Sequence, residues 1–237
     1  MSRALPRVFL PGADLSEPIE LPKEEFEKFH KVLRLGSGDP IAVLPNDGTL
    51  WECRLQGRQA VPVRRTQPDV EPKIQVTIAQ ALPKGDRIET VVRMGTEIGV
   101  VRFVLFMAER SVARWDASKR HDRIRRLESI AREAAEQSFR TKLPEIAWFD
   151  SLKTFLKANP DAIVLSESES ALPTLAKVWR ERLAAGRREV SLVVGPEGGW
   201  SPAEFATIGD RGATLGPRVL RTDTAGPAAA ALVLLDF

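Results

Sequence analysis

The sequence has a single cysteine, Cys53, among 237 residues, which excludes an internal disulfide and a zinc site built from cysteines. It also lacks any apolar run long enough to span a membrane. The first residues, 1–17, are interrupted by Pro6, Pro11 and Gly12, so we find no secretory signal peptide. From these absences we expect a soluble, cytoplasmic protein that uses neither a membrane nor a metal ion.

The usual nucleotide-binding signatures are missing as well. A glycine-rich segment, Val193–Pro202, follows the apolar run Val190–Val194, but it has neither the Lys-Ser/Thr pair of a P-loop nor the Gly-x-Gly-x-x-Gly spacing of a dinucleotide site. Its three glycines and two prolines predict a loop that a ligand or another backbone can approach closely. The alternative is a plain turn in which Ser201 caps a helix beginning at Pro202.

With 43% apolar residues the chain can bury one large core or two modest ones. Residues 1–71 contain short apolar segments, one amphipathic helical pattern at Glu24–Leu33 and a hairpin turn at Pro45–Gly48, which together predict a small, mainly antiparallel barrel. The expected strands are Val8–Leu10, Ile41–Leu44, Leu50–Leu55 and Val61–Val63. The polar, proline-rich stretch 67–72 indicates a linker, so a second domain is expected over residues 72–237.

In residues 72–237 strand-like and helix-like segments alternate, which predicts an α/β fold whose parallel sheet is covered by helices on both faces. The expected strands are Ile74–Leu82, Val101–Met107, Ala162–Leu165 and Val190–Val194. The expected helices are Asp86–Ile98, Ala117–Arg140, Ser151–Ala158, Leu172–Ala185, one from Pro202, and Pro227–Phe237. The last helix is apolar nearly all round, so it lies either inside the domain or at a subunit interface.

The segment Leu215–Ala225 contains Arg218 and Arg221, followed by Thr-Asp-Thr, side chains typical of a helix start. A loop that only caps the last helix explains the threonines, but it does not explain two arginines beside a single acid, Asp223. Helix N-termini already attract anions, so these arginines predict an anionic ligand. This segment, the glycine-rich loop and Leu165–Ser166 all follow expected strands, and we expect them to meet in one pocket at the carboxyl edge of the sheet.

Positive charge is concentrated in residues 110–142, which hold ten Lys/Arg and five Asp/Glu. We interpret this excess as a surface for RNA phosphates, although a solvated helix face with i,i+4 ion pairs is the alternative. A second cluster lies in the later strands of the first domain, where a solvated strand face is the more frequent explanation. Its members are Arg54, Arg58, Arg64 and Arg65.

Together the two loop motifs resemble one family. Gly195–Gly199 (Gly-Pro-Glu-Gly-Gly) and Leu215–Ala225 (Leu-Gly-Pro-Arg-Val-Leu-Arg-Thr-Asp-Thr-Ala) are similar to the paired signatures of the 16S ribosomal RNA uridine-N3 methyltransferases of the SPOUT class. Further similar blocks follow the family's order: His30 with Val32–Arg34, Ala81–Asp86, Thr96–Val100, Glu109–Ser111 and Ala135–Ser138. Nearly the whole chain is covered, and the ordered set is far more specific than any single block.

The resemblance implies an enzyme that uses S-adenosylmethionine to methylate N3 of a uridine, with ribosomal RNA or the small ribosomal subunit as substrate, and that works as a homodimer. It also implies a PUA-like RNA-binding barrel over residues 1–71 and a SPOUT domain with a deep trefoil knot over residues 72–237. Asp223 stands where the family more often has glutamate. It either accepts the N3 proton or holds Arg221 or a backbone amide.

Site residues follow from the same resemblance. Catalytic roles are expected for Arg221, Asp223 and Arg218. The expected cofactor-binding residues are Leu165, Ser166, Gly195, Glu197, Gly198, Leu215, Gly216, Leu220, Thr222, Thr224 and Ala225. The expected RNA-binding residues are Arg34, Arg64, Arg65, Arg110, Arg123, Arg126, Gln137 and Arg140. Two alternatives stay open: a noncatalytic RNA-binding or ribosome-associated module on the same fold, and an enzyme with another RNA substrate or another nucleotide cofactor.

Overall fold

The computed structural model describes residues 5–167 and 172–235, and the chain divides into two compact units. The first unit comprises the chain up to Glu71 together with Ala135–Leu143, and the second comprises Pro72–Ala134 and the chain from Pro144 onward. No local sequence pattern indicates that Ala135–Leu143 packs with residues so distant along the chain. Among the described residues, no helix is both long and apolar enough to cross a membrane.

The first unit is built on a five-stranded sheet in the order β1-β3-β4-β5-β2. The strands are β1 (Arg7–Phe9), β2 (Ile19–Glu20), β3 (Pro40–Leu44), β4 (Leu50–Gln56) and β5 (Gln59–Thr66). The β1–β3 pair is parallel and the other pairs are antiparallel. The helical segment consists of α1 (Lys23–Glu27) and a π-helical turn, η2 (Lys28–Val32). Because β1 and β2 form the two edges of this sheet, a closed barrel stays a prediction.

Within the first unit, Glu71 holds the segment that follows the long basic helix. Its Oε2 accepts hydrogen bonds from Arg140 Nη2 and Nε at 2.8 and 3.2 Å, and its Oε1 accepts from the backbone N–H groups of Thr141 and Lys142 at 2.7 and 3.0 Å. Arg140 is only 4% exposed. The expected RNA contact of Arg140 therefore does not fit this structure, because the guanidinium is directed inward to a carboxylate.

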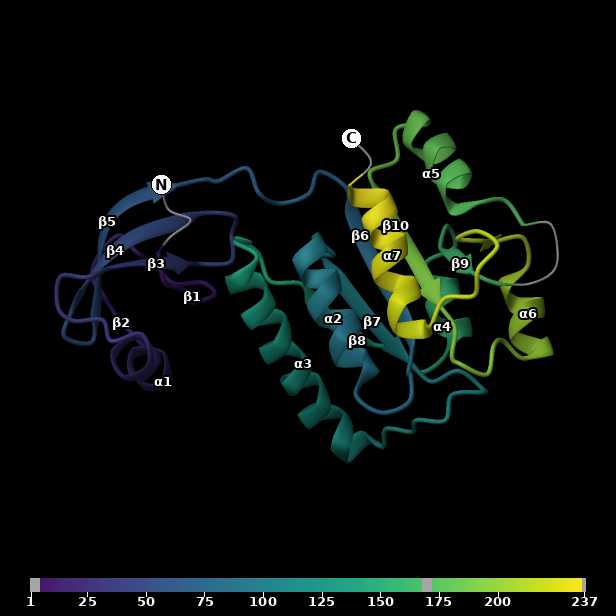
Figure 1. The fold of residues 1–237 in the computed structure, drawn as a ribbon, viewed down its shortest axis with the longest axis horizontal. Helices are drawn as coiled ribbons and strands as arrows, with labels where there is room; N and C mark the ends of the chain where they lie inside the picture. Colours follow the sequence, from purple (N-terminus) through teal and green to yellow (C-terminus); the bar gives the residue numbers. More distant parts are fainter. Residues whose placement is uncertain (1–4, 168–171, 236–237) are drawn as a thin grey trace. The chain divides into compact units, whose positions relative to one another are not determined.

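The second unit contains a six-stranded sheet in the order β11-β9-β10-β6-β7-β8, and every neighbouring pair is parallel (Figure 1). Its strands are β6 (Gln75–Ala81), β7 (Arg102–Phe106), β8 (Glu145–Trp148), β9 (Ile163–Leu165), β10 (Glu189–Val194) and β11 (Gly212–Ala213). Its helices are α2 (Arg87–Ile98), α3 (Ala117–Gln137), α4 (Leu152–Ala158), α5 (Leu175–Ala184), α6 (Pro202–Ile208) and α7 (Thr222–Leu234). The predicted α/β architecture with a parallel sheet is confirmed.

Alternate residues of each strand enter two different cores, as expected for a sheet buried on both faces. One core joins Ile78 and its neighbours to α2, α3, α5 and α7, and the other joins Ala79 and its neighbours to α4 and α6. Gly95 shows how closely α2 approaches the sheet, since a Cβ at this position would lie 2.7 Å from the ring of Phe103. Helices α2 and α7 lie side by side on the first of these faces (Figure 1).

The last helix is longer at its start than its sequence predicts. Arg221 occupies the N-cap position, and its carbonyl accepts hydrogen bonds from the N–H groups of Thr224 and Ala225, both at 2.9 Å. Pro227 therefore lies inside α7 instead of opening it, and the missing N–H leaves one turn of the helix without its usual bond. Strands β8 and β11 were not predicted, because both are short and not strongly apolar.

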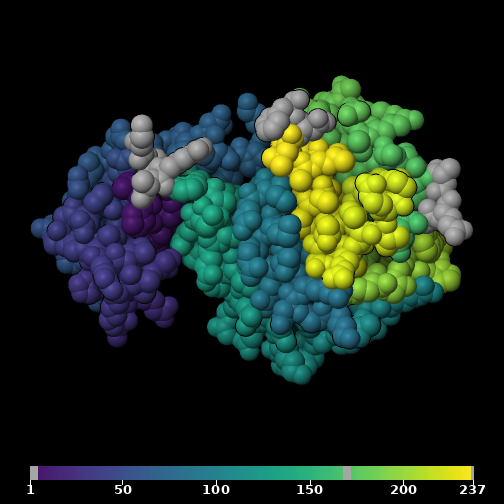
Figure 2. Space-filling model, viewed as in Figure 1, coloured from purple at the N-terminus to yellow at the C-terminus, as the bar shows by residue number. Residues whose placement is uncertain are grey.

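Helix α7 has an inner and an outer side. Gly226, Ala229 and Val233 are buried against the sheet, whereas Leu235, which follows the helix, is 53% exposed. Figure 2 shows part of α7 and the preceding loop, in yellow, uncovered on this face of the second unit. The helix is therefore neither fully internal nor fully exposed, and some of its apolar outer side faces solvent.

Candidate functional site

The glycine-rich loop after β10 packs tightly on its own tryptophan. The φ angle of Gly195 is outside the left-handed region, yet an added Cβ would lie 3.0 Å from Trp200 Cε2. Trp200 is 4% exposed, stacks on Phe106 and points its Nε1 at the Leu165 carbonyl, 3.5 Å away. Glycine is needed here for close packing, and the loop ends in the capping box of α6, where Ser201 and Glu204 exchange hydrogen bonds.

The second loop, between β11 and α7, is shaped by Thr214 and Gly216. Thr214 Oγ1 accepts a hydrogen bond from the Gly216 N–H at 3.2 Å and donates to the Gly216 carbonyl at 3.1 Å. Gly216 has a φ of +116°, which favours glycine. The loop then exposes Arg218 and Arg221 while Leu220 stays half-buried. Neither guanidinium makes an ion pair with any residue that the structure describes.

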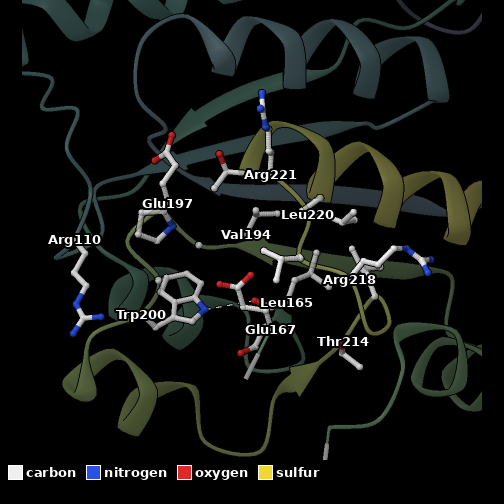
Figure 3. Close-up of a pocket in the computed structure, with 18 of the residues that line it drawn as sticks. Arg110, Leu165, Glu167, Val194, Glu197, Trp200, Thr214, Arg218, Leu220 and Arg221 are labelled. Carbon is white, nitrogen blue, oxygen red and sulfur yellow. Dashed lines mark hydrogen bonds between the residues drawn. The ribbon is translucent and has the colours of Figure 1, made fainter. Parts of the chain in front are cut away.

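These two loops and the end of β9 enclose one pocket of about 530 Å³ (Figure 3). Apolar walls come from Leu165, Val194, Leu215 and Leu220, with Trp200 nearby. The charged residues at the pocket are Arg87, Arg110, Glu167, Glu197, Arg218 and Arg221. Parallel strands bring their carboxyl ends to one edge of the sheet, so segments distant in sequence meet here as predicted.

Most of the expected cofactor residues line this pocket. They are Leu165, Ser166, Gly195, Glu197, Leu215, Gly216, Leu220, Thr222 and Ala225. Gly198 and Thr224 are not among the lining residues, although Gly198 lies in the same loop. Of the expected catalytic residues, Arg218 and Arg221 line the pocket and Asp223 does not.

Sequence reasoning missed several lining residues. Arg87 reaches the pocket from the first turn of α2, and Phe205 reaches it from α6. For Arg87 a signal was present, because it directly follows the similar block Ala81–Asp86 at the end of β6. For Phe205 there was none, since an apolar residue in a short helix normally indicates core packing.

Three loops at this edge are tied together by side chains. Glu197 Oε1 accepts hydrogen bonds from the Lys84 N–H at 3.0 Å and from Arg87 Nη1 at 3.1 Å, which joins the loop after β10 to the loop after β6. Arg110, from the loop after β7, donates to the Gly198 carbonyl at 3.2 Å. Glu204 Oε1 accepts from the Glu109 N–H at 3.0 Å. The rim is therefore held in place before any ligand binds.

Unpaired polar atoms gather at the start of α7. Thr222 Oγ1, Asp223 Oδ1 and Gln80 Oε1 are all buried without a hydrogen-bond partner in the described part of the chain. Gly226, one turn further on, lies against Ile78 and Gln80, and a Cβ here would be 3.5 Å from Gln80 Oε1. Buried acceptors normally find a donor, so this region has capacity for a ligand group or bound water.

The expected RNA-binding residues fall into different environments. Arg34, Arg65 and Gln137 are exposed, and Arg110 lies at the pocket. The others make ion pairs: Arg64 with Glu52 at 2.7 Å, Arg126 with Glu89 at 2.5 Å, and Arg123 with Asp86 at 3.6 Å. These exposed pairs contribute little stability, so an RNA phosphate can compete for the arginines at low cost.

Comparison with known proteins places these features in context. A protein-family model for an RNA methyltransferase domain matches residues 70–234. The chain is similar to ribosomal RNA small subunit methyltransferase E of Bacillus subtilis, with 34% identity over 214 residues, 85% of this chain and 84% of that protein. The enzyme of the same name from Mycobacterium tuberculosis is 34% identical over 218 residues, 86% of this chain and 81% of that protein.

Solved structures resemble the whole chain. A methyltransferase from Legionella pneumophila, in complex with the cofactor SAM (S-adenosylmethionine), superposes with a TM-score of 0.84 at 26% identity, covering 96% of each chain. A ribosomal RNA small subunit methyltransferase E from Neisseria gonorrhoeae gives a TM-score of 0.81 at 24% identity, covering 96% of this chain and 95% of that chain. The second likeness concerns the fold alone.

Proposed function

Because this chain belongs to the RNA methyltransferase domain family, and within it to the ribosomal RNA small subunit methyltransferase E proteins, we propose that it methylates N3 of a uridine in small-subunit ribosomal RNA. The observation that carries the proposal is the meeting of the two motif loops, Gly195–Gly199 and Leu215–Ala225, at one pocket. Because its substrate would be ribosomal RNA, the cytoplasm is the proposed location.

S-adenosylmethionine is the cofactor, and the pocket fits it. Its volume of about 530 Å³ lies within the range of small-molecule sites, and its walls combine aliphatic side chains with a few polar groups. Leu165, Val194 and Leu220 suit a flat nucleoside, while the backbone around Gly195 and Gly216 offers hydrogen bonds at close range. When bound, this cofactor supplies a methyl group activated by a positively charged sulfur.

The side chains of the second loop would act on the uridine. Negative charge develops on the uracil oxygens as the N3 proton leaves, and a positioned guanidinium stabilises such charge. Arg221 and Arg218 are exposed at the pocket without a carboxylate partner in the described chain, so they are available for this role. Alignment of the reacting groups would supply much of the acceleration.

Asp223 has two possible functions in this proposal. Its buried and unpaired Oδ1 suits either a proton acceptor or an anchor for a donor that arrives with the substrate. Asp223→Asn distinguishes the two. A proton acceptor requires a steep fall in single-turnover rate together with loss of a pH-dependent limb, whereas an anchoring role requires a smaller loss at every pH.

The finer features of the fold belong to the same proposal. A trefoil knot would involve the loop Thr214–Arg221, and support comes from the packing of α7, the last helix, against β6 and β10 in the middle of the sheet. In the first unit, the open five-stranded sheet would serve as a PUA-like RNA-binding module. Its exposed arginines, Arg34, Arg65 and the Glu52-paired Arg64, would contact phosphates.

A homodimer is the proposed state of assembly. The outer side of α7 leaves Leu232 half-buried and Leu235 53% exposed, although this helix is apolar nearly throughout. Covering that side with the same surface of a second copy would remove these side chains from water. Light scattering at micromolar concentration tests this proposal, and a mass of 26.2 kDa, that of one chain, would contradict it.

The function is tested by methylation of defined RNA substrates. Small ribosomal subunits and protein-free 16S ribosomal RNA are incubated with labelled S-adenosylmethionine, and mass spectrometry of nuclease digests identifies the methylated base. We expect label at uridine N3, and reverse transcription should stop there because the methyl group blocks base pairing. Label in another RNA would indicate a different substrate. Absence of cofactor binding in calorimetry would indicate a noncatalytic RNA-binding module.

A further inference from the structure

The rim of the pocket carries one pair of opposite charges in direct contact. Arg87 opens α2 and Glu197 lies in the loop after β10, and both line the pocket. Arg87 Nη1 is 3.1 Å from Glu197 Oε1, which also accepts the Lys84 N–H at 3.0 Å. Both contacts use the same oxygen, so Glu197 Oε2 has no hydrogen-bond partner among the described residues.

The other charged groups at the pocket lack such a partner. Arg110 donates to a backbone carbonyl, that of Gly198. Arg218, Arg221 and Glu167 make no ion pair within the described chain. Arg87 and Glu197 are therefore the pocket residues that present a positive and a negative group side by side, each held by a contact with its surroundings.

We infer that Arg87 and Glu197 bind the amino-acid end of S-adenosylmethionine, with Arg87 taking the α-carboxylate and Glu197 the α-ammonium. This inference rests on the proposed use of that cofactor. A zwitterion carries two adjacent opposite charges, and this pair offers their complement. The two side chains are 39% and 29% exposed, so solvent already screens their mutual attraction and its rearrangement costs little.

The position of the pair agrees with the layout of the pocket. Figure 3 shows Glu197 across the pocket from Arg218 and Thr214, with the aliphatic walls Leu165 and Val194 between them. The nucleoside would lie against these walls and the charged tail would extend to the Glu197 rim. Glu197 was expected among the cofactor residues from sequence, whereas Arg87 was not.

Four ligands separate the charged contacts from the rest of the pocket. Calorimetry is performed with S-adenosylhomocysteine and with 5′-methylthioadenosine, a thioether that lacks the amino-acid group. Decarboxylated S-adenosylmethionine, which keeps the ammonium but not the carboxylate, is compared with S-adenosylmethionine. We expect Arg87→Ala and Glu197→Gln each to weaken S-adenosylhomocysteine about tenfold, the effect of one partly exposed charged contact. Neither should alter methylthioadenosine. With the decarboxylated ligand, only Glu197→Gln should reduce affinity.

Matched controls come from the same helix. Arg93→Ala and Glu97→Gln change exposed charges of α2 that do not line the pocket, and they should leave all four affinities unchanged. Glutamine at 197 keeps an oxygen for the Lys84 N–H, and Arg87→Gln is a second variant should alanine impair folding, as judged by thermal melting. Equal loss for S-adenosylhomocysteine and methylthioadenosine, or no loss for either, would overturn the inference. A wild-type protein that binds none of the ligands would instead refute the proposed function.

Discussion

Replacing Gly195 with alanine should weaken S-adenosylmethionine binding through a clash inside the glycine-rich loop. The new Cβ would lie 3.0 Å from Trp200 Cε2, 3.1 Å from Cζ2 and 3.4 Å from Nε1. Carbon atoms prefer about 3.5–4.0 Å, so the overlap reaches about half an ångström. Because Gly195 does not have a positive φ, backbone strain makes no contribution and the effect is purely steric.

The tryptophan has little freedom to move away. It is 4% exposed and stacks on Phe106, with 6.4 Å between ring centroids and 4° between ring planes. Overpacking of such a contact costs about 1–3 kcal/mol. Part of this cost will appear as lower stability and part as displacement of the loop that lines the pocket. A loop displacement of about 1–2 kcal/mol corresponds to about 5- to 30-fold in affinity.

The assay pairs calorimetric titration of S-adenosylmethionine with urea unfolding. Gly36→Ala is the control, because its nearest atom to a new Cβ is Asp39 Oδ2 at 3.9 Å and its φ is not positive. Adding Trp200→Phe, which removes the indole atoms that meet the new Cβ, should restore part of the affinity, with a coupling free energy of about 0.5–3 kcal/mol. Wild-type affinity in Gly195→Ala would refute the steric argument.

Four further outcomes are expected. Arg221→Ala should retain most cofactor affinity while single-turnover methylation falls about a hundredfold or more, the effect of losing one preorganised charge; an unchanged rate would remove the loop from the catalytic centre. Alanine at Arg123 and Arg126 should flatten the salt dependence of RNA binding by about one unit for every phosphate interaction that the substitution removes, and an unchanged slope would show that they only pair with acids. Burial raises the pKa of the Cys53 thiol to about 12, so iodoacetamide should modify it only after unfolding, and its neutral form should stabilise the fold below the ordinary pKa of 9.0, with this contribution lost as pH rises towards 12; rapid modification of the native protein would contradict this. Leu235→Glu should reduce the mass measured by light scattering if α7 forms a dimer, and an unchanged dimer would place the interface elsewhere.

Local sequence patterns predicted much of the second unit. Most of its longer strands and helices appear at or near the expected residues, and the capping of α6 by Ser201 occurs as expected. These features depend on interactions between near neighbours in the chain, such as the hydrogen bond from the Glu204 N–H to Ser201 Oγ at 3.1 Å. Patterns failed where a short segment is defined by a distant partner. β11 is two residues long and exists because it pairs with β9.

The pocket shows the same division. The sequence by itself determined that loops rich in glycine and arginine follow apolar strands, and the rule that parallel strands end at one edge was enough to predict that they meet. Only the tertiary structure decided that Arg87 faces Glu197, more than a hundred residues away, and that Arg140 is buried against Glu71 instead of facing RNA. Charge composition cannot distinguish a paired arginine from an available one, because the partner is chosen by the packing of segments far apart in the chain.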